Sequence, residues 1–191
     1  MHLPANAALL IVDVQRGFDD PAWGERNNPG AEANIARLLA AWRSGGRPVH
    51  HVHHVSLHAD GSFRHGSAGH LPKPEAEPRA GEMVHRKTVN SAFIGTALEE
   101  TLTSAGIRTL VIVGFTTNHC VSTTARMAGN LGFDTYVVAD ATAAFQRRAL
   151  DGTIRPAQTV HDGALSDIQG EFAAIVDTQA VLAAGVTPMP E

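Results

Sequence analysis

The chain has 191 residues, of which 43% are hydrophobic and 18% charged, and its formal net charge is -4 at pH 7. This composition is typical of a soluble globular protein large enough to bury one continuous core. The weak negative charge argues against a nucleic-acid partner, because such binding needs concentrated positive charge. No stretch approaches the roughly 20 apolar residues of a membrane span, so no membrane partner is expected.

Two further features of the chain bear on its location. The N-terminal segment has no basic region before its first apolar run, so it does not resemble a signal peptide. A single cysteine, Cys120, excludes an intrachain disulfide, which fits a reducing compartment. We therefore expect a cytoplasmic protein with one domain spanning residues 1–191.

Apolar runs alternate with helical patterns along the first half of the chain. Residues 8–14 are apolar and β-branched, which predicts a buried strand. Residues 30–46 carry apolar side chains at helical spacing and end in a glycine pair, which predicts a helix. Residues 47–56 predict a second strand. Residues 57–82 are rich in Gly, Pro, His and charge, and they predict a long loop of the kind that often has a function.

The second half continues the alternation. The further predicted strands cover residues 83–89, 108–115, 133–140 and 171–178. The further predicted helices cover residues 91–106, 121–132, 157–165 and 179–185. Strands that are apolar on both faces and joined by helices imply an α/β fold with a mostly parallel central sheet covered on both sides, a three-layer α/β/α architecture.

Three chemically useful side chains follow strands of this predicted sheet. Asp13 ends the first strand, Lys87 lies near the end of the third, and Cys120 comes just after the fourth. Ligands bind beyond the carboxyl ends of such strands, so we expect the three to converge at one sheet edge. Cys120 also precedes a helix, whose N-terminal charge and N–H groups favour a reactive thiolate and can hold an oxyanion.

Each of these residues also has a structural alternative. A lone cysteine is often a small buried hydrophobe, a buried aspartate can serve in a salt bridge, and lysines usually lie on the surface. Together, however, Asp13 can take the thiol proton and Lys87 can keep that carboxylate ionised.

The segments ALLIVDVQRGF (8–18), HRKTVNSAFIGTALEETL (85–102) and GIRTLVIVGFTTNHC with its continuation to residue 145 resemble the isochorismatase-like cysteine hydrolases. That family includes nicotinamidases, N-carbamoylsarcosine amidohydrolases, biuret and ureidoacrylate hydrolases, and isochorismatases. The resemblance implies a Rossmann-like isochorismatase fold and a catalytic set of Asp13, Lys87 and Cys120. It also implies a cis peptide between Phe115 and Thr116, and an oxyanion hole formed by the backbone N–H groups of Thr116 and Cys120.

The implied reaction is cleavage of a C–N bond in a small amide, ureide or carbamoyl compound through a thioester on Cys120. Nicotinamidases bind a metal through an aspartate and two histidines, and these positions fall near His54, Ser56 and Ser62, where the carboxylate is absent. The histidine-rich segment 50–70 has no recognised zinc spacing, so we expect no metal. No phosphate loop or dinucleotide fingerprint is present, so we expect no cofactor.

Several residues near these motifs are expected to contact the small-molecule substrate. They are Gln15, Phe18, Trp23, Asn118 and Phe145. His119 is a weaker acid–base candidate than the catalytic set, and His161 is expected to be structural. Arg147 and Arg148 are predicted to be a solvated charge pair, although two arginines can also bind a carboxylate.

Two other functions remain open from the sequence. One is hydrolysis of a vinyl ether such as isochorismate, which releases pyruvate instead of an amine. The other is a non-catalytic thiol sensor that keeps the fold and the cysteine. The resemblance also implies a homodimer or homotetramer.

Overall fold

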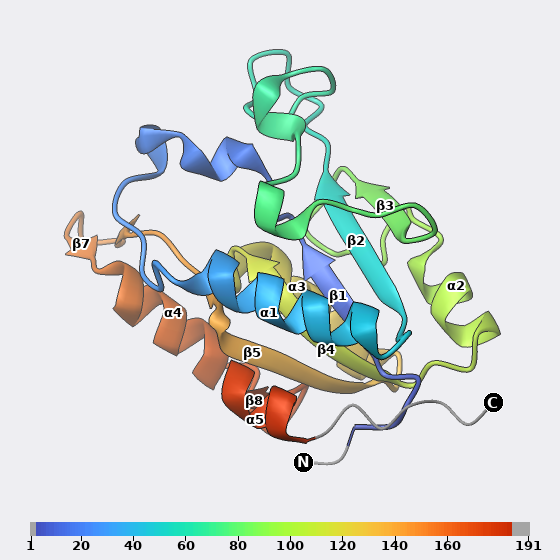
Figure 1. Ribbon diagram of the computed structural model, residues 1–191. Helices are drawn as coiled ribbons and strands as arrows, with labels where there is room; N and C mark the ends of the chain where they lie inside the picture. Colours follow the sequence, from blue (N-terminus) through green and yellow to red (C-terminus); the bar gives the residue numbers. More distant parts are fainter. Residues whose placement is uncertain (1–2, 185–191) are drawn as a thin grey trace.

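The centre of the fold is a six-stranded sheet with the order β3-β2-β1-β4-β5-β8, in which every neighbouring pair is parallel (Figure 1). The structure, a computed structural model, describes residues 3–184. The strands are β1 (Ala8–Val12), β2 (Val49–His54), β3 (Met83–Lys87), β4 (Thr109–Phe115), β5 (Asp134–Ala143) and β8 (Ala174–Val176). A separate antiparallel hairpin pairs β6 (Arg147–Arg148) with β7 (Ile154–Arg155).

Helices cover both faces of this sheet. One face packs against α1 (Ala31–Ser44) and α5 (Thr178–Ala183). The other packs against α2 (Leu98–Ser104), α3 (Ser122–Asn130) and α4 (Ala157–Ser166). Alternate residues of β1 enter the two cores, because successive side chains of a strand point to opposite faces. The three-layer α/β/α fold predicted from the sequence is confirmed.

The strand order creates a crevice between β1 and β4. From β1 the chain extends the sheet to β2 and β3, whereas from β4 it extends the other way to β5 and β8. In such sheets the connections leave opposite sides at the point where the order reverses, and ligands bind there, beyond the carboxyl ends of the strands. Asp13 follows β1 and the turn that carries Cys120 follows β4, so both lie at this crevice.

Some predicted elements have different bounds in the structure. Within residues 91–106 the helix begins only at Leu98, because Gly95 has φ +72° and Phe93 is buried against Phe133. The predicted strand 133–140 extends to Ala143, and the predicted strand 171–178 shortens to the three residues of β8.

Other segments also differ from expectation. The predicted loop 57–82 contains two short 3₁₀ helices, η3 (Ala68–His70) and η4 (Pro74–Ala76). The β6–β7 hairpin was not predicted. The terminal helix predicted over residues 179–185 appears as α5, and Gly185 lies outside the described residues. Between residues 3 and 184, no helix has the length and apolar character needed to cross a membrane.

Gly114 marks a close approach of β4 to β1. Its φ is +117°, and a Cβ at this position would lie 2.0 Å from the carbonyl oxygen of Val12. We expect Gly114→Ala to lower the free energy of unfolding by about 3 kcal/mol or more, because it combines backbone strain with a clash against the neighbouring strand. Urea denaturation measures this loss. Gly30→Ala is the control, because a Cβ at Gly30 meets no atom within 4 Å; equal stability of the two variants would contradict the prediction.

Candidate active site

Asp13, Lys87 and Cys120 meet at the carboxyl edge of the sheet. The Lys87 ammonium lies 2.6 Å from Asp13 Oδ2 and 3.3 Å from Cys120 Sγ, and it also donates to the carbonyl oxygen of Val89 at 3.1 Å. Asp13 and Lys87 are almost completely buried, at 0% and 1% exposure. Three strand ends thus bring an acid, a cation and a thiol into contact.

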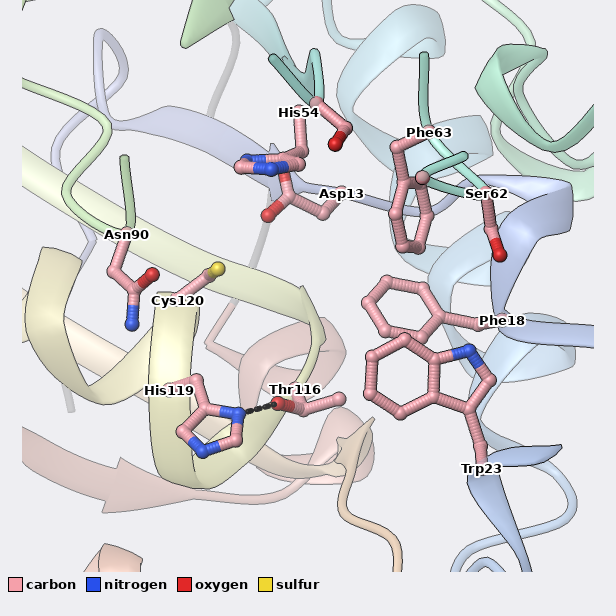
Figure 2. Close-up of a pocket in the computed structure, with 12 residues that line it drawn as sticks. Asp13, Phe18, Trp23, His54, Ser62, Phe63, Asn90, Thr116, His119 and Cys120 are labelled. Carbon is pink, nitrogen blue, oxygen red and sulfur yellow. Dashed lines mark hydrogen bonds between the residues drawn. The ribbon is translucent and has the colours of Figure 1, made fainter. Parts of the chain in front are cut away.

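The backbone holds Asp13 in an unusual conformation. Its φ is +51°, a region that residues other than glycine rarely adopt, and its N–H donates to the carbonyl oxygen of Val52 on β2 at 2.8 Å. Oδ2 is engaged by Lys87, whereas Oδ1 is buried with no hydrogen-bond partner among residues 3–184. Figure 2 shows the Asp13 carboxyl group beside the sulfur of Cys120. The carboxyl group therefore has an oxygen that can accept from the thiol.

The cysteine lies in a π-helical turn, η5 (Thr117–Val121), between β4 and α3. The peptide bond between Phe115 and Thr116 is cis. The Thr116 carbonyl oxygen accepts from the N–H groups of His119 and Val121 at 3.1 and 3.2 Å. Thr117 Oγ1 lies 2.8 Å from Nδ1 of His161 on α4, which gives that buried histidine a structural partner. These contacts hold the cysteine turn against both the sheet and α4.

The surroundings of Cys120 do not favour a resting thiolate. Burial and, to a smaller extent, the negative charge of Asp13 raise the pKa of the thiol to about 12, against the opposing effect of Lys87. Burial and the charge of Asp13 therefore oppose the thiolate that the helix N-terminus was expected to favour. Burial likewise raises the pKa of Asp13 against the opposing effect of Lys87. At neutral pH the thiol keeps its proton and needs a base when it reacts.

This protonation state predicts slow alkylation. At pH 7 we expect iodoacetamide to modify Cys120 at least about tenfold more slowly than it modifies a free model thiol, because only the thiolate reacts. The rate should still be rising at pH 10, where the model thiol is already ionised. Mass spectrometry of quenched samples across this pH range measures the rate at pH 7 and its rise toward pH 10. A rate at pH 7 equal to that of the model thiol would show that the thiolate is present at rest.

A cavity of about 420 Å³ opens beside the thiol. Its lining residues are Asp13, Phe18, Trp23, His54, Ser56, Gly61, Ser62, Phe63, Asn90, Thr116, His119 and Cys120. Figure 2 shows two walls: the reactive groups with the histidines and Asn90 on one side, and the aromatic rings on the other. The cavity thus pairs a polar, reactive face with an apolar one, an arrangement typical of small-molecule sites.

The apolar wall is a cluster of three rings. Phe18 lies 5.1 Å from Trp23 and 4.8 Å from Phe63, measured between ring centroids. Phe18 and Trp23 come from the consecutive 3₁₀ helices η1 (Arg16–Asp19) and η2 (Pro21–Trp23), and Phe63 comes from the 57–82 loop. The Trp23 indole N–H donates to the Gly17 carbonyl oxygen at 2.9 Å, which fixes the ring at the edge of the cavity.

The polar wall is electrically neutral apart from the Asp13–Lys87 ion pair. Burial and the nearby Lys87 lower the pKa of His54 to about 4. Burial, with a smaller effect of Arg147, lowers the pKa of His119. Both histidines are therefore uncharged at neutral pH. No arginine or lysine belongs to the lining formed by the described residues.

The expected substrate contacts divide into two groups. Phe18 and Trp23 line the cavity, and Phe145 lies behind them, with its ring 6.0 Å from Phe18 and 5.5 Å from Trp23. Gln15 is buried and does not belong to the cavity lining, and Asn118 lines a different hollow. Phe63 and Asn90 line the cavity but were not predicted from the sequence. The position of Asn90, just after the strand that carries Lys87, could have indicated its place at the cavity.

Gln15 braces the loop instead of lining the cavity. Its side-chain amide donates to the carbonyl oxygens of His54 at 3.1 Å and His70 at 2.8 Å. Its Oε1 accepts from the backbone N–H of His54 at 2.8 Å. The residue therefore ties the end of β2 and the 57–82 loop to the segment that follows β1.

The positions that correspond to a nicotinamidase metal site do not fit a divalent cation. His54, Ser56 and Ser62 all line the cavity, but they offer one imidazole and two neutral hydroxyls without a carboxylate. Ser56 Oγ already accepts from the His58 N–H at 3.2 Å. No cluster of three His, Cys, Asp or Glu side chains suited to a metal occurs within the part of the chain that the structure describes. Zinc sites use imidazole, thiolate and carboxylate ligands, which this set lacks.

The fold and the site together define a doubly wound α/β protein with a cysteine, a lysine and an aspartate beside a small-molecule cavity. The model of the isochorismatase domain family matches residues 7–180, and the chain therefore belongs to that family. The isochorismatase family protein YrdC of Bacillus subtilis is 49% identical over 92% of this chain and 94% of its own length. A crystal structure of an isochorismatase-family protein from Chromobacterium violaceum has a TM-score of 0.94 and 42% identity, and covers 96% of both chains.

Two more distant relatives have names that state an activity. Ureidoacrylate amidohydrolase RutB of Variovorax paradoxus is 29% identical over 72% of this chain and 69% of its own length. The secreted isochorismatase effector Isc1 of Verticillium dahliae is 32% identical over 71% of this chain and 72% of its own length. One of these relatives is thus named as an amidohydrolase and the other as an isochorismatase.

Proposed function

We propose that the protein hydrolyses a C–N bond of a small amide-like molecule, with Cys120 as the nucleophile. The observation that supports this proposal best is the contact of Lys87 with both Asp13 and Cys120 at the edge of a cavity. A thiol beside a buried carboxylate with a free oxygen is suited to acyl transfer, because the carboxylate can take the thiol proton. The relationship to an amidohydrolase supports the same chemistry.

The first half of the reaction forms a thioester. Asp13 removes the proton from Cys120 as the sulfur attacks the substrate carbonyl carbon, which compensates for the high pKa of the thiol. Lys87 stabilises the negative charge that develops on sulfur. The carbonyl oxygen becomes an oxyanion, held by the backbone N–H groups of Thr116 and Cys120. Asp13 then gives its proton to the leaving nitrogen, the C–N bond breaks, and ammonia or an amine departs.

The second half restores the enzyme. Asp13 removes a proton from a water molecule that attacks the thioester carbonyl carbon, and the same N–H groups hold the second oxyanion. When the C–S bond breaks, the proton on Asp13 passes to the sulfur, and the acid is released. One water is consumed for each amide cleaved, and Asp13 and Cys120 return to their starting protonation states.

The cavity favours a neutral substrate with a flat apolar group. Phe18, Trp23 and Phe63 offer ring faces opposite the thiol, and aromatic rings pack well against one another. With His54 and His119 uncharged, the cavity lining formed by the described residues contains no cation to pair with a substrate carboxylate. Burying an unpaired carboxylate is costly, so acidic amides should be poor substrates.

Ammonia release from pairs of amides tests this function. Each pair has one neutral aromatic or aliphatic amide and the same molecule with an added carboxylate, assayed with wild type and Cys120→Ala. We expect release only by wild type and a higher kcat/KM for the neutral member. Absence of ammonia release across a broad panel would count against C–N hydrolysis. Preference for the acidic members would count only against the neutral substrate class.

Vinyl-ether hydrolysis is the second candidate, and the relative Isc1 favours it. Isochorismate is anionic, however, and the cavity lining described above has no free cation. Pyruvate release from isochorismate, measured with a coupled dehydrogenase, separates the two functions. Turnover that persists in Cys120→Ala would assign this protein to the vinyl-ether group.

A further inference from the structure

A second hollow lies on the other side of the cysteine turn. It has a volume of about 630 Å³ and is formed by the beginning of α3, by α4 and by the β6–β7 hairpin. Asn118 lines this hollow, whereas the next residue, His119, lines the reaction cavity. The five-residue turn η5 therefore separates the two spaces, and the proposed reaction uses none of the hollow's side chains.

Four arginines surround this hollow: Arg126, Arg147, Arg148 and Arg155. None of them forms an ion pair among the described residues, where Asp167 is the only carboxylate of the lining. Arg126 and Arg148 each donate to a backbone carbonyl oxygen, of Asp167 and Gly152. A guanidinium cannot lose its charge in a protein, so an anion bound among the four would lower their mutual repulsion.

Other donors of the hollow suit an oxyanion. Ser122 and Thr123 lie in the first turn of α3 and line the hollow with Asn118. Their hydroxyl groups and the Asn118 side-chain amide can donate to an oxyanion, and arginine forks match phosphate oxygens in pairs. A ligand with a single carboxylate cannot neutralise the positive charge of the four arginines. The hollow therefore favours a phosphate ligand with several negative charges.

The hollow also has an apolar margin. Ala149, Leu150 and Val160 belong to its lining, and Leu150 is fully exposed at the tip of the hairpin. An exposed leucine beside arginines has no role in the hairpin's own packing. It can contact the organic part of a ligand whose phosphates bind the arginines.

We propose that this arginine hollow is a binding site for a small molecule that carries two or more phosphate groups. The bound phosphates lie against the beginning of α3, and the organic part lies along the hairpin. The site is distinct from the reaction cavity, and its existence does not depend on the reaction proposed above. A ligand bound there contacts the opposite side of the turn that carries Cys120.

Isothermal titration of the intact protein with inorganic pyrophosphate at constant ionic strength tests the site. We expect saturable binding by wild type, and Arg155→Glu should weaken it by at least about tenfold, because a repelling charge replaces a guanidinium donor. The matched control is Arg37→Glu, since Arg37 is exposed on α1 across the sheet and has no ion pair among the described residues. It makes the same change in net charge and should bind pyrophosphate like wild type.

A second variant and a second anion also test the phosphate site. Arg148→Gln, on the exposed hairpin, should weaken binding even if Arg155→Glu does not fold. Citrate, a carboxylate anion, should bind more weakly than pyrophosphate. Absence of saturable binding, an equal loss in Arg37→Glu, or equal affinity for citrate would each overturn the phosphate site.

Discussion

Cys120→Ala is expected to lower the rate of amide hydrolysis by about 10⁴-fold or more, the scale seen when an enzyme loses its nucleophile. The variant removes the only sulfur nucleophile of the chain and leaves the strand ends and the cavity walls in place. Its stability should stay within about 1 kcal/mol of wild type, because only one small side chain is lost. Ammonia release and urea denaturation of the same preparation measure both quantities.

A matched variant separates thiol chemistry from packing. Cys120→Ser keeps a hydroxyl in place of the thiol and a similar volume, and it should be nearly as inactive as Cys120→Ala, because the hydroxyl is a much weaker acid and leaving group. An alanine variant that kept more than a tenth of the wild-type rate would show that Cys120 is not the nucleophile.

Asp13→Asn is expected to damage both catalysis and folding. The rate should fall by about 10²–10⁴-fold, because an amide cannot take the thiol proton. The Lys87 ammonium, which is 1% exposed, would remain buried without its 2.6 Å partner. Removing one member of a buried pair typically costs about 3–5 kcal/mol, so the free energy of unfolding should fall by that order. Single-turnover kinetics and urea denaturation at pH 7 give the two numbers.

A double variant tells the two effects apart. Asp13→Asn combined with Lys87→Met replaces the unpaired Lys87 ammonium with an apolar side chain, so much of the lost free energy of unfolding should return. Activity should not return, because the proton acceptor is still missing. Recovery of activity together with stability would mean that Asp13 acts through folding alone and not as a base.

The sequence predicted the sheet well because its central strands are buried on both faces. The runs that became β1 and β4 consist almost entirely of apolar residues, and every residue of both strands is buried. The β6–β7 hairpin was missed for the opposite reason. Its strands have two residues each, all four are exposed, and such short segments have no periodicity to detect.

The site was only partly predictable for a related reason. Asp13, Lys87 and Cys120 follow strands, so the parallel topology alone indicates where they lie. Phe63 comes from the 57–82 loop, whose path depends on contacts far away in sequence, such as those of Gln15 with His54 and His70. The high pKa of the thiol also depends on burial, which neither spacing nor composition reveals.

Strand ends hold the ion pair and the thiol, whereas a loop supplies part of the cavity wall, so the two can change independently. The reacting groups are anchored by the backbone of the sheet, whereas Phe63 and Ser62 stand on a loop that Gln15 ties to the sheet from below. Substitutions at these two positions can alter the shape of the cavity without displacing the ion pair or the thiol. New substrate selectivities are therefore accessible to this scaffold through single changes in the loop, with the reaction itself preserved.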